Sequence, residues 1–246
     1  MNIIEINRHV DVFSRDSFGD RRIDVIGAGA SGSRIVLSLA KLGIENIHVW
    51  DFDIVEAHNI ANQVYSQADI GRPKVEALKD LVKAHTGMDL TIHNERVDGS
   101  QTLGEIVFLL TDTMSSRSEI WKKALRYKVG TKLMIETRMG ADEGRVYTIN
   151  PTRPKQVRGW EGTLYGDDVA PVSACGTTIS VGPTAEFISG LAVWQLIRWH
   201  AIEQATEKAA AASEPTSGQA TDTPVPLDHE LVFGMQPAFL MSRQFE

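Results

Sequence analysis

The sequence predicts an α/β fold: a Rossmann-like, doubly wound and mostly parallel sheet with helices on both faces, extended by antiparallel strands in the C-terminal half. Short apolar runs alternate with segments of helical periodicity as far as residue 138. A glycine-rich turn directly follows the first apolar run, and after Gly140 the alternation stops. Regular alternation of strand and helix is typical of a parallel sheet with helices packed on its faces.

The first elements follow from local patterns. An apolar run at residues 23–26 predicts a strand, and the glycines of residues 27–32 predict a tight turn after it. Apolar positions at helical spacing over 35–42 predict a helix that ends at Gly43, and Ile47–Trp50 reads as the second strand. A strand, a glycine turn, a helix and a second strand make one βαβ unit.

The next elements repeat this rhythm. Pro73 suits the first turn of a helix, and Gly87 suits its end. The continuous apolar run at 106–110 is typical of a buried parallel strand. The other expected elements are strands at 90–92 and 133–137 and a helix near 118–127.

The C-terminal half is expected to differ. An antiparallel strand is expected at 145–149, a long loop at 151–171, and a helix at 186–205 whose apolar positions, Phe187 to Ile197, read as core. We expect one folded domain at 1–205, made of the α/β part at 20–138 and the part at 139–205, then a flexible linker at 206–229 and a docking tail at 230–246 with a strand at 231–233.

The glycine turn carries a functional signal. Gly27, Gly29 and Gly32 have the spacing that allows a tight turn, close approach of a phosphate and close packing of helix on strand. The helix N-terminus beyond them offers free N–H groups to an anion. Asp51 ends the second strand about 20 residues later, the usual position of a carboxylate that binds a ribose. The spacing therefore predicts a nucleotide site.

Composition narrows the function classes. The net charge of −7 argues against a general nucleic-acid or anionic-membrane surface, and no apolar stretch is long enough to cross a bilayer. The N-terminus lacks the features of a secretory signal. The single cysteine, Cys175, excludes an internal disulfide, and no histidine has zinc-ligand spacing, so no zinc is expected. These features favour a reducing cytoplasm.

Further polar residues fall at the carboxyl ends of the expected strands. Asp53 and Asn59 follow the second strand, Lys74 opens a helix, and Asp112 follows the apolar run at 106–110. Carboxylates near a polyphosphate are tolerated when a hard, oxygen-ligated cation such as Mg²⁺ lies between them. These four polar residues together favour a nucleoside triphosphate over NAD as the ligand. Capping, turn or surface roles remain open for Asp53, Lys74 and Asp112 individually.

These motifs together resemble the ThiF/MoeB-like adenylyltransferases, relatives of the ubiquitin-activating enzymes. The family pattern is GxGxxG, D-x-D-x-V, Asn, Arg-Gln, I/V-G-x-x-K and T-D-x-x-x-x-R. The matching residues are Gly27, Gly29, Gly32, Asp51, Asp53, Val55, Asn59, Gln63, Ile70, Gly71, Lys74, Thr111, Asp112 and Arg117. The resemblance covers residues 8–200. It implies that residues 1–205 form an ATP-binding adenylation domain, with a nucleotide half at 20–138 and an acceptor-binding half at 139–205.

The resemblance implies residue roles. Asp51 would bind the ribose, Asn59 and Lys74 the phosphates, and Asp112 the Mg²⁺ ion. The remaining matched positions that would bind ATP are Gly27, Gly29, Gly32, Asp53, Gln63 and Arg117. The implied reaction is attack of a carboxylate on the α-phosphate of ATP, giving an acyl-adenylate and pyrophosphate. The usual carboxylate is the C-terminal glycine of a Gly-Gly ubiquitin-like or sulfur-carrier protein.

Two more roles are implied. The family acts as a homodimer in which an N-terminal arginine reaches the neighbour's triphosphate; Arg8 matches it, and Arg15 is the alternative. Cys175 stands where a family cysteine takes the activated group, although a lone cysteine among small residues is also typical of simple burial. Both assignments are expectations from the resemblance.

The chain departs from the pattern in two places. Asn62 stands where the family has arginine, so a cation that faces phosphate is missing; Arg72 and Arg117 are candidates to replace it. The paired CxxC zinc motifs of bacterial members are absent. Three alternatives to carrier activation stay open: adenylation of a small-molecule or tRNA-nucleoside carboxylate, a nucleotide-binding scaffold without catalysis, and an NAD oxidoreductase.

Overall fold

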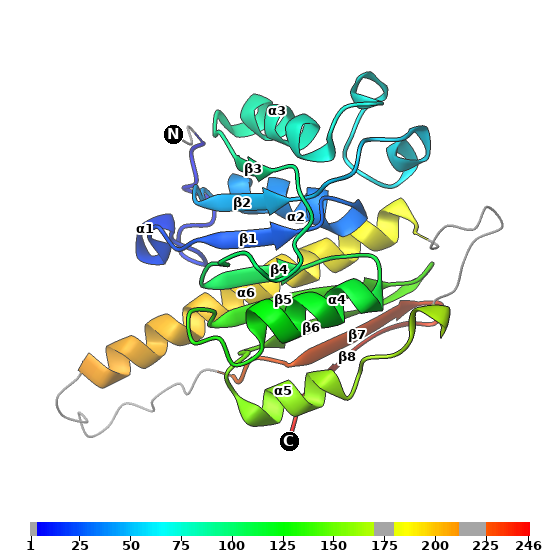
Figure 1. Cartoon of the computed structure of the whole chain (residues 1–246). Coiled ribbons are helices and arrows are strands. Elements are labelled where there is room, and N and C mark those ends of the chain that lie inside the picture. The colour runs from blue at the N-terminus through cyan, green and yellow to red at the C-terminus, as the bar shows by residue number, and fades with distance from the viewer. Residues whose placement is uncertain (1–3, 170–179, 212–224) are drawn as a thin grey trace.

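The computed structural model describes residues 4–169, 180–211 and 225–246. Its strands form one sheet of eight in the order β3-β2-β1-β4-β5-β6-β7-β8 (Figure 1). The strands are β1 (Ile23–Ile26), β2 (Ile47–Trp50), β3 (Thr91–His93), β4 (Ile106–Leu109), β5 (Leu133–Met139), β6 (Glu143–Ile149), β7 (Glu230–Met235) and β8 (Ala238–Arg243). The first five run parallel and the last three are antiparallel to their neighbours. The fold predicted from the sequence is confirmed.

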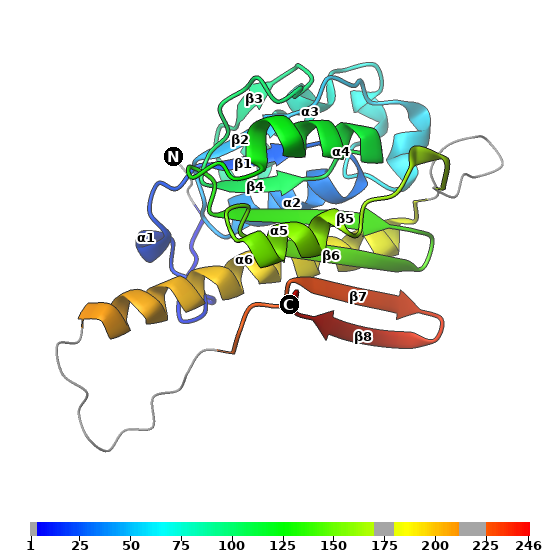
Figure 2. The ribbon, with the colours of Figure 1, turned by 60° about the horizontal axis from the view of Figure 1, so that its bottom comes forward.

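Helices cover both faces of this sheet. They are α1 (Arg15–Phe18), α2 (Ala30–Lys41), α3 (Lys74–Thr86), α4 (Met114–Ile120), α5 (Pro154–Glu161) and α6 (Gly182–Ala211), with shorter helical turns at Ala57–Ala61, Gln67–Asp69, Trp121–Leu125 and Asp167–Val169. Residues of α2, α3 and α6 pack in one core cluster, and those of α4 and α5 in a second one on the opposite face. Figure 2 shows α4 and α5 on one side of the strands and α2 and α6 on the other.

Alternating side chains of each strand supply the two cores. Val25 points into the core beneath α2 and α6, whereas Ile26 packs on the opposite face. Successive side chains of a strand point to opposite faces, so a central strand buried on both faces must be apolar throughout. All four residues of β1 and of β4 are buried, and all are apolar except Asp24, whose carboxylate accepts hydrogen bonds from Arg22, the indole of Trp50 and the N–H of Gly104.

The long loop expected at 151–171 is wrong in its first part, because residues Pro154–Glu161 form α5. Pro154 starts the helix, and Val157 and Trp160, one turn apart, are fully buried against the sheet. The prediction of a loop rested on the three glycines and several charged residues of this segment, and Gly159 is one of those glycines. A Cβ at Gly159 would lie 2.2 Å from the ring of Phe245, so this glycine makes room for the C-terminal aromatic residue.

Two other helix boundaries differ from expectation. The helix expected near 118–127 begins at Met114, and from Trp121 it continues as a π-helical turn to Leu125. The helix expected at 186–205 runs from Gly182 to Ala211 and so extends into the segment expected as a linker. Its apolar stripe is only partly core: Phe187 is 41% and Trp194 53% exposed.

The C-terminal strands complete the sheet. β7 pairs with β6 in antiparallel register, Val146 opposite Leu231, and β8 pairs with β7. The expected strand at 231–233 lies inside β7. Within the described ranges, no helix is both long and apolar enough to span a membrane.

Candidate functional site

The candidate site lies where the order of the strands reverses. β1 has β2 on one side and β4 on the other, and the chain leaves β1 and β4 at the same edge of the sheet. In open parallel sheets, a crevice forms at this point outside the carboxyl ends of the strands. The glycine turn after β1, the residues after β2 and the Thr111–Asp112 pair after β4 therefore share one edge.

The glycine turn has the shape of a phosphate cradle. Gly27 has a φ of +103°, and a Cβ there would lie 2.7 Å from the carbonyl oxygen of Leu110. At Gly32 a Cβ would lie 1.9 Å from the carbonyl oxygen of Gly27, so helix α2 can approach the turn only with glycine at this position. Gly29, by contrast, has open space where a Cβ would stand.

That open space lies at the N-terminus of α2. Gly29 is the N-cap residue and has no side chain to cap the helix, so the first N–H groups of α2 stay available to an anion. The three glycines therefore do different work: two permit close packing of the backbone, and the third leaves room over the helix end.

Asp51 is bound to the glycine turn. Its carboxylate accepts hydrogen bonds from the N–H of Ala28 at 2.6 Å and of Asp53 at 2.8 Å. Burial raises the pKa of Asp51, an effect that the positive charge of Lys74 opposes. The hydroxyl of Tyr65 donates to the carbonyl oxygen of Ala28 at 2.7 Å and fixes the turn from the other side.

Lys74 reaches the same edge from the start of α3. It is buried, and its Nζ forms an ion pair with Oδ2 of Asp53 at 2.8 Å. Asn59 is buried in the preceding helical turn, where its Oδ1 accepts a hydrogen bond from the N–H of Glu56 at 2.9 Å. The structure thus brings Asp51, Asp53 and Lys74 together.

Asp112 is exposed beyond the end of β4. The start of the next helix, α4, is fixed by Asp167, whose carboxylate accepts hydrogen bonds from the N–H of Met114 at 2.6 Å and of Ser115 at 3.1 Å. Among the described residues no three His, Cys, Asp or Glu side chains group as a metal site. Mg²⁺ commonly takes one or two carboxylates plus phosphate and water oxygens, so Asp112 alone fits a magnesium ion that arrives with ATP.

Arg117 lies beneath the edge rather than at its surface. It forms an ion pair with Glu136 at 3.1 Å and donates to the carbonyl oxygen of Thr137 at 3.1 Å. Glu136 is fully buried and also binds Arg138 and the indole of Trp160. Burial lowers the pKa of Arg117. This network anchors the end of β5, and it commits the guanidinium of Arg117 to protein partners.

One expected catalytic residue, Arg8, is not at this edge. Arg8 is exposed in the N-terminal segment, and the neighbouring Ile6 packs near Gly43, beyond the far end of α2. Helix α2 has 12 residues, about 18 Å in length, so Arg8 lies remote from its own chain's glycine turn. Cys175 lies outside the described residues.

The structure adds one residue that the sequence reasoning missed. Arg34, on α2, donates through one guanidinium nitrogen to the carbonyl oxygen of Asn62 at 2.7 Å and to that of Ala30 at 2.9 Å. Asn62 and Gln63 each bury a side-chain oxygen that has no hydrogen-bond partner in the part of the chain that the structure describes. The available signal was a basic residue one helical turn beyond a glycine-rich phosphate turn.

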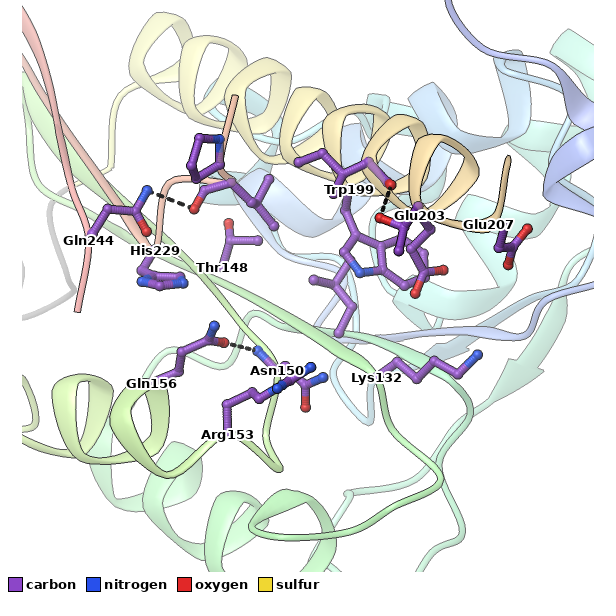
Figure 3. Close-up of a pocket in the computed structure, with 15 residues that line it drawn as sticks. Lys132, Thr148, Asn150, Arg153, Gln156, Trp199, Glu203, Glu207, His229 and Gln244 are labelled. Atoms are coloured by element: carbon purple, nitrogen blue, oxygen red, sulfur yellow. Dashed lines mark hydrogen bonds between the residues drawn. The ribbon is translucent and has the colours of Figure 1, made fainter. Parts of the chain in front are cut away.

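A second hollow lies at the opposite edge, where β5 begins and β6 ends. Its volume is about 560 Å³, and Lys132, Arg153, Trp199 and His229 are among the side chains around it (Figure 3). None of the residues predicted for the nucleotide site lines it. Of these two places, only the glycine-turn edge contains residues predicted to bind the nucleotide.

Comparison with known proteins assigns the family. A family model described as "ThiF family" matches residues 7–221, and the chain belongs to that family. The chain is 30% identical over 122 residues to the molybdopterin-synthase adenylyltransferase of Salmonella typhimurium, a match that covers 47% of this chain and 49% of that protein. It is 34% identical over 90 residues to the NEDD8-activating enzyme E1 catalytic subunit of Arabidopsis thaliana, covering 35% of this chain and 20% of that one.

Solved structures agree on the fold. The E. coli protein MccB, solved with ATP, matches with a TM-score of 0.65 and 14% identity, covering 94% of this chain and 65% of that chain. At this identity the likeness concerns the fold alone. The chain spans about half the length of the molybdopterin-synthase relative.

Proposed function

We propose that this protein is an ATP-dependent adenylyltransferase that activates the C-terminal carboxylate of a ubiquitin-like or sulfur-carrier protein ending in Gly-Gly. The observation that carries the proposal is the meeting of three features at one sheet edge: the open N-terminus of α2 at Gly29, the buried cation Lys74 and the exposed carboxylate Asp112. The names of the relatives support adenylyl transfer.

In the proposed reaction, a carboxylate oxygen of the acceptor attacks the α-phosphorus of ATP. The bond from that phosphorus to the bridging oxygen of the β-phosphate breaks, and pyrophosphate leaves. The free N–H groups of α2 and the Nζ of Lys74 bind phosphate oxygens. As the family resemblance implies, Asp51 binds the ribose and Asn59 binds the phosphates. Mg²⁺, held by Asp112, supplies charge neutralisation on the phosphates when bound.

This arrangement favours ATP over NAD for an electrostatic reason. Asp53 and Asp112 add negative charge to an edge that would receive phosphates, and such a site needs compensating cations. Lys74 supplies one and a divalent ion supplies the rest. The two phosphates of NAD do not need a metal ion as the triphosphate of ATP does.

ATP–pyrophosphate exchange tests the proposal. Exchange should appear only when a carrier protein with a free C-terminal Gly-Gly is present, since the acyl-adenylate must form before pyrophosphate can return. The control is the same carrier with its C-terminal carboxylate amidated, which should give background exchange. Tight NAD binding without ATP binding in calorimetry would contradict the proposal; exchange stimulated by a small carboxylate alone would favour the small-molecule alternative.

We also propose that Cys175 receives the activated group. Its sulfur, as thiolate, would attack the acyl carbon of the adenylate, AMP would leave, and a thioester would form. Adenylation needs no thiol, so Cys175→Ser should keep pyrophosphate exchange and lose the reducible adduct on non-reducing gels. Carrier transfer at the wild-type rate in this variant would make Cys175 structural.

A further inference from the structure

We propose that Arg34 binds the polyphosphate of ATP and replaces the cation that position 62 lacks. The inference rests on the proposed function, because it takes ATP as the ligand of the glycine-turn edge. Four observations on the described residues carry it: the place of Arg34 on α2, its contacts, the neutralised state of other nearby arginines, and the unpartnered polar atoms beside it.

Arg34 is placed by the phosphate cradle itself. It lies on the second turn of α2, and its guanidinium folds back toward the start of the helix to donate to the carbonyl oxygen of Ala30 at 2.9 Å. The same nitrogen donates to the carbonyl oxygen of Asn62 at 2.7 Å. The cation is thus held directly against the residue where a positive side chain is missing.

These contacts orient the guanidinium and leave its charge in place. Carbonyl oxygens accept hydrogen bonds but carry no formal charge, and the guanidinium keeps further N–H donors. The acidic side chain paired with it is Glu186, at 3.7 Å, which is 72% exposed. Such an exposed and long ion pair neutralises little charge. The side chain of Arg34 is itself only 14% exposed, so its field is screened less than that of a surface arginine.

Arg72 and Arg117, the candidates named from the sequence, are differently placed. Arg72 forms ion pairs with both Asp69 and Asp80. Arg117 shares the buried carboxylate of Glu136 with Arg138. The charge of Arg72 is thus balanced by two carboxylates, and the guanidinium of Arg117 is held on the buried Glu136 beneath the edge, whereas Arg34 has only the weak pairing with Glu186.

Polar atoms beside Arg34 indicate a ligand. Oδ1 of Asn62 and Oγ of Ser180 are buried and have no hydrogen-bond partner among the described residues. Buried polar groups are nearly always paired with protein, water or ligand. The start of α6 closes on the same place, because a Cβ at Gly182 would lie 3.3 Å from the carbonyl oxygen of Ala61 and 3.8 Å from a guanidinium nitrogen of Arg34. These atoms border the space into which the phosphates would extend from α2.

Calorimetry with ATP, AMP and adenosine tests the inference on the intact protein. Arg34→Gln should weaken ATP binding about tenfold to a hundredfold, as expected for loss of a hydrogen bond to a charged group, while adenosine affinity stays within about twofold. AMP should lie between the two. The matched control is Arg72→Gln, which removes an arginine whose charge is already balanced and should leave ATP affinity within about twofold.

A double variant separates charge from structure. Arg34→Gln combined with Asn62→Arg moves the cation to the other side of the Asn62 contact and should recover most of the lost ATP affinity. If Arg34 only ties α2 to the loop, adenosine and ATP affinities fall together and Asn62→Arg gives no rescue, which overturns the inference. Equal ATP affinity in Arg34→Gln and wild type overturns it as well. Absence of ATP binding by the wild-type protein would instead contradict the proposed function.

Discussion

Lys74 and Asp53 form an ion pair of 2.8 Å at the mouth of the candidate site, with the lysine buried and the aspartate side chain 51% exposed. Lys74 is therefore held in place by a carboxylate before any phosphate arrives. An incoming phosphate can share this cation from the open side, because Asp53 leaves part of the ammonium group's donors free.

Replacement of Lys74 by methionine should lower kcat/KM for ATP–pyrophosphate exchange about 100-fold, since a preorganised cation facing the transferring phosphate is lost. The methionine keeps the apolar stem, so the protein should stay folded. The matched control is Lys83→Met on the same helix, which removes an exposed ion pair with Asp89. Unchanged exchange in Lys74→Met would show that the lysine only pairs with Asp53.

Alanine substitutions at two glycines of the turn should separate an effect on folding stability from an effect on ATP binding. Gly32→Ala should lower the free energy of unfolding by about 2 kcal/mol or more, because its Cβ would lie 1.9 Å from the carbonyl oxygen of Gly27. Gly29→Ala should leave the free energy of unfolding within about 0.5 kcal/mol, because no atom of the described residues lies within 4 Å of the added Cβ.

The two variants also differ in what happens to the ligand. Gly29→Ala places a methyl group where a phosphate would approach α2, so ATP affinity should fall although the fold persists. Urea denaturation measures the first effect and calorimetry the second. A Gly29→Ala protein with wild-type ATP affinity would place the phosphates elsewhere.

His200 should make stability depend on pH. Its ring packs against Phe13 and Phe18, its Nε2 lies 2.9 Å from Oγ of Ser17, and burial lowers the pKa of His200, with Arg21 acting in the same direction. The folded state therefore holds the ring neutral, while the unfolded chain protonates near its ordinary value of about 6.5.

As pH falls below about 6.5, the unfolded state binds the extra proton, and stability falls until the lowered folded-state pKa is passed. The limiting slope for one such group is about 1.4 kcal/mol per pH unit. Urea denaturation at several pH values between 7.5 and 5 should show a smaller acid slope for His200→Phe than for wild type. Identical slopes would mean that His200 does not contribute.

Protomers with Arg8→Ala and protomers with Asp112→Ala should restore activity when they pair in one dimer. Arg8 lies remote from its own glycine turn, so in the proposed homodimer it acts on the partner's ATP. Arg8→Ala and Asp112→Ala should each be folded and inactive, because both side chains are exposed. An equal mixture of re-equilibrated protomers should regain about a quarter of the wild-type activity, because random pairing makes about half of the dimers mixed and each mixed dimer has one intact site of its two.

The control for this experiment is a mixture of Arg8→Ala with itself after the same treatment, which should stay inactive. Sedimentation gives the oligomeric state of the wild-type protein in parallel. A protein that is active as a strict monomer would rule out this arrangement. It would also rule out Arg15, the alternative donor, as a residue that acts on the partner's ATP.

Local patterns in the sequence determined the architecture as far as β5, together with the edge at which the site lies. The spacing of Gly27, Gly29 and Gly32 specifies a turn by local sterics, and the placement of Asp51, Lys74 and Asp112 after apolar runs follows from the way parallel strands end together. Local patterns did not predict helix α5, because a glycine such as Gly159 is typical of a loop. The reason for a glycine in this helix lies at the far end of the chain, since Phe245 fills the space beside Gly159.

Only the tertiary structure decided which charges are free. Arg117, on helix α4, matches a family motif, yet it forms an ion pair with Glu136 of strand β5. Arg34 matches no motif, yet it lies against Asn62. Asp167 caps α4 from a segment that follows two further strands in the chain. Such contacts join residues distant in sequence, and no local periodicity encodes them. Their geometry depends on the packing of whole elements, because a charge is neutralised by whatever the fold places within a few ångströms of it.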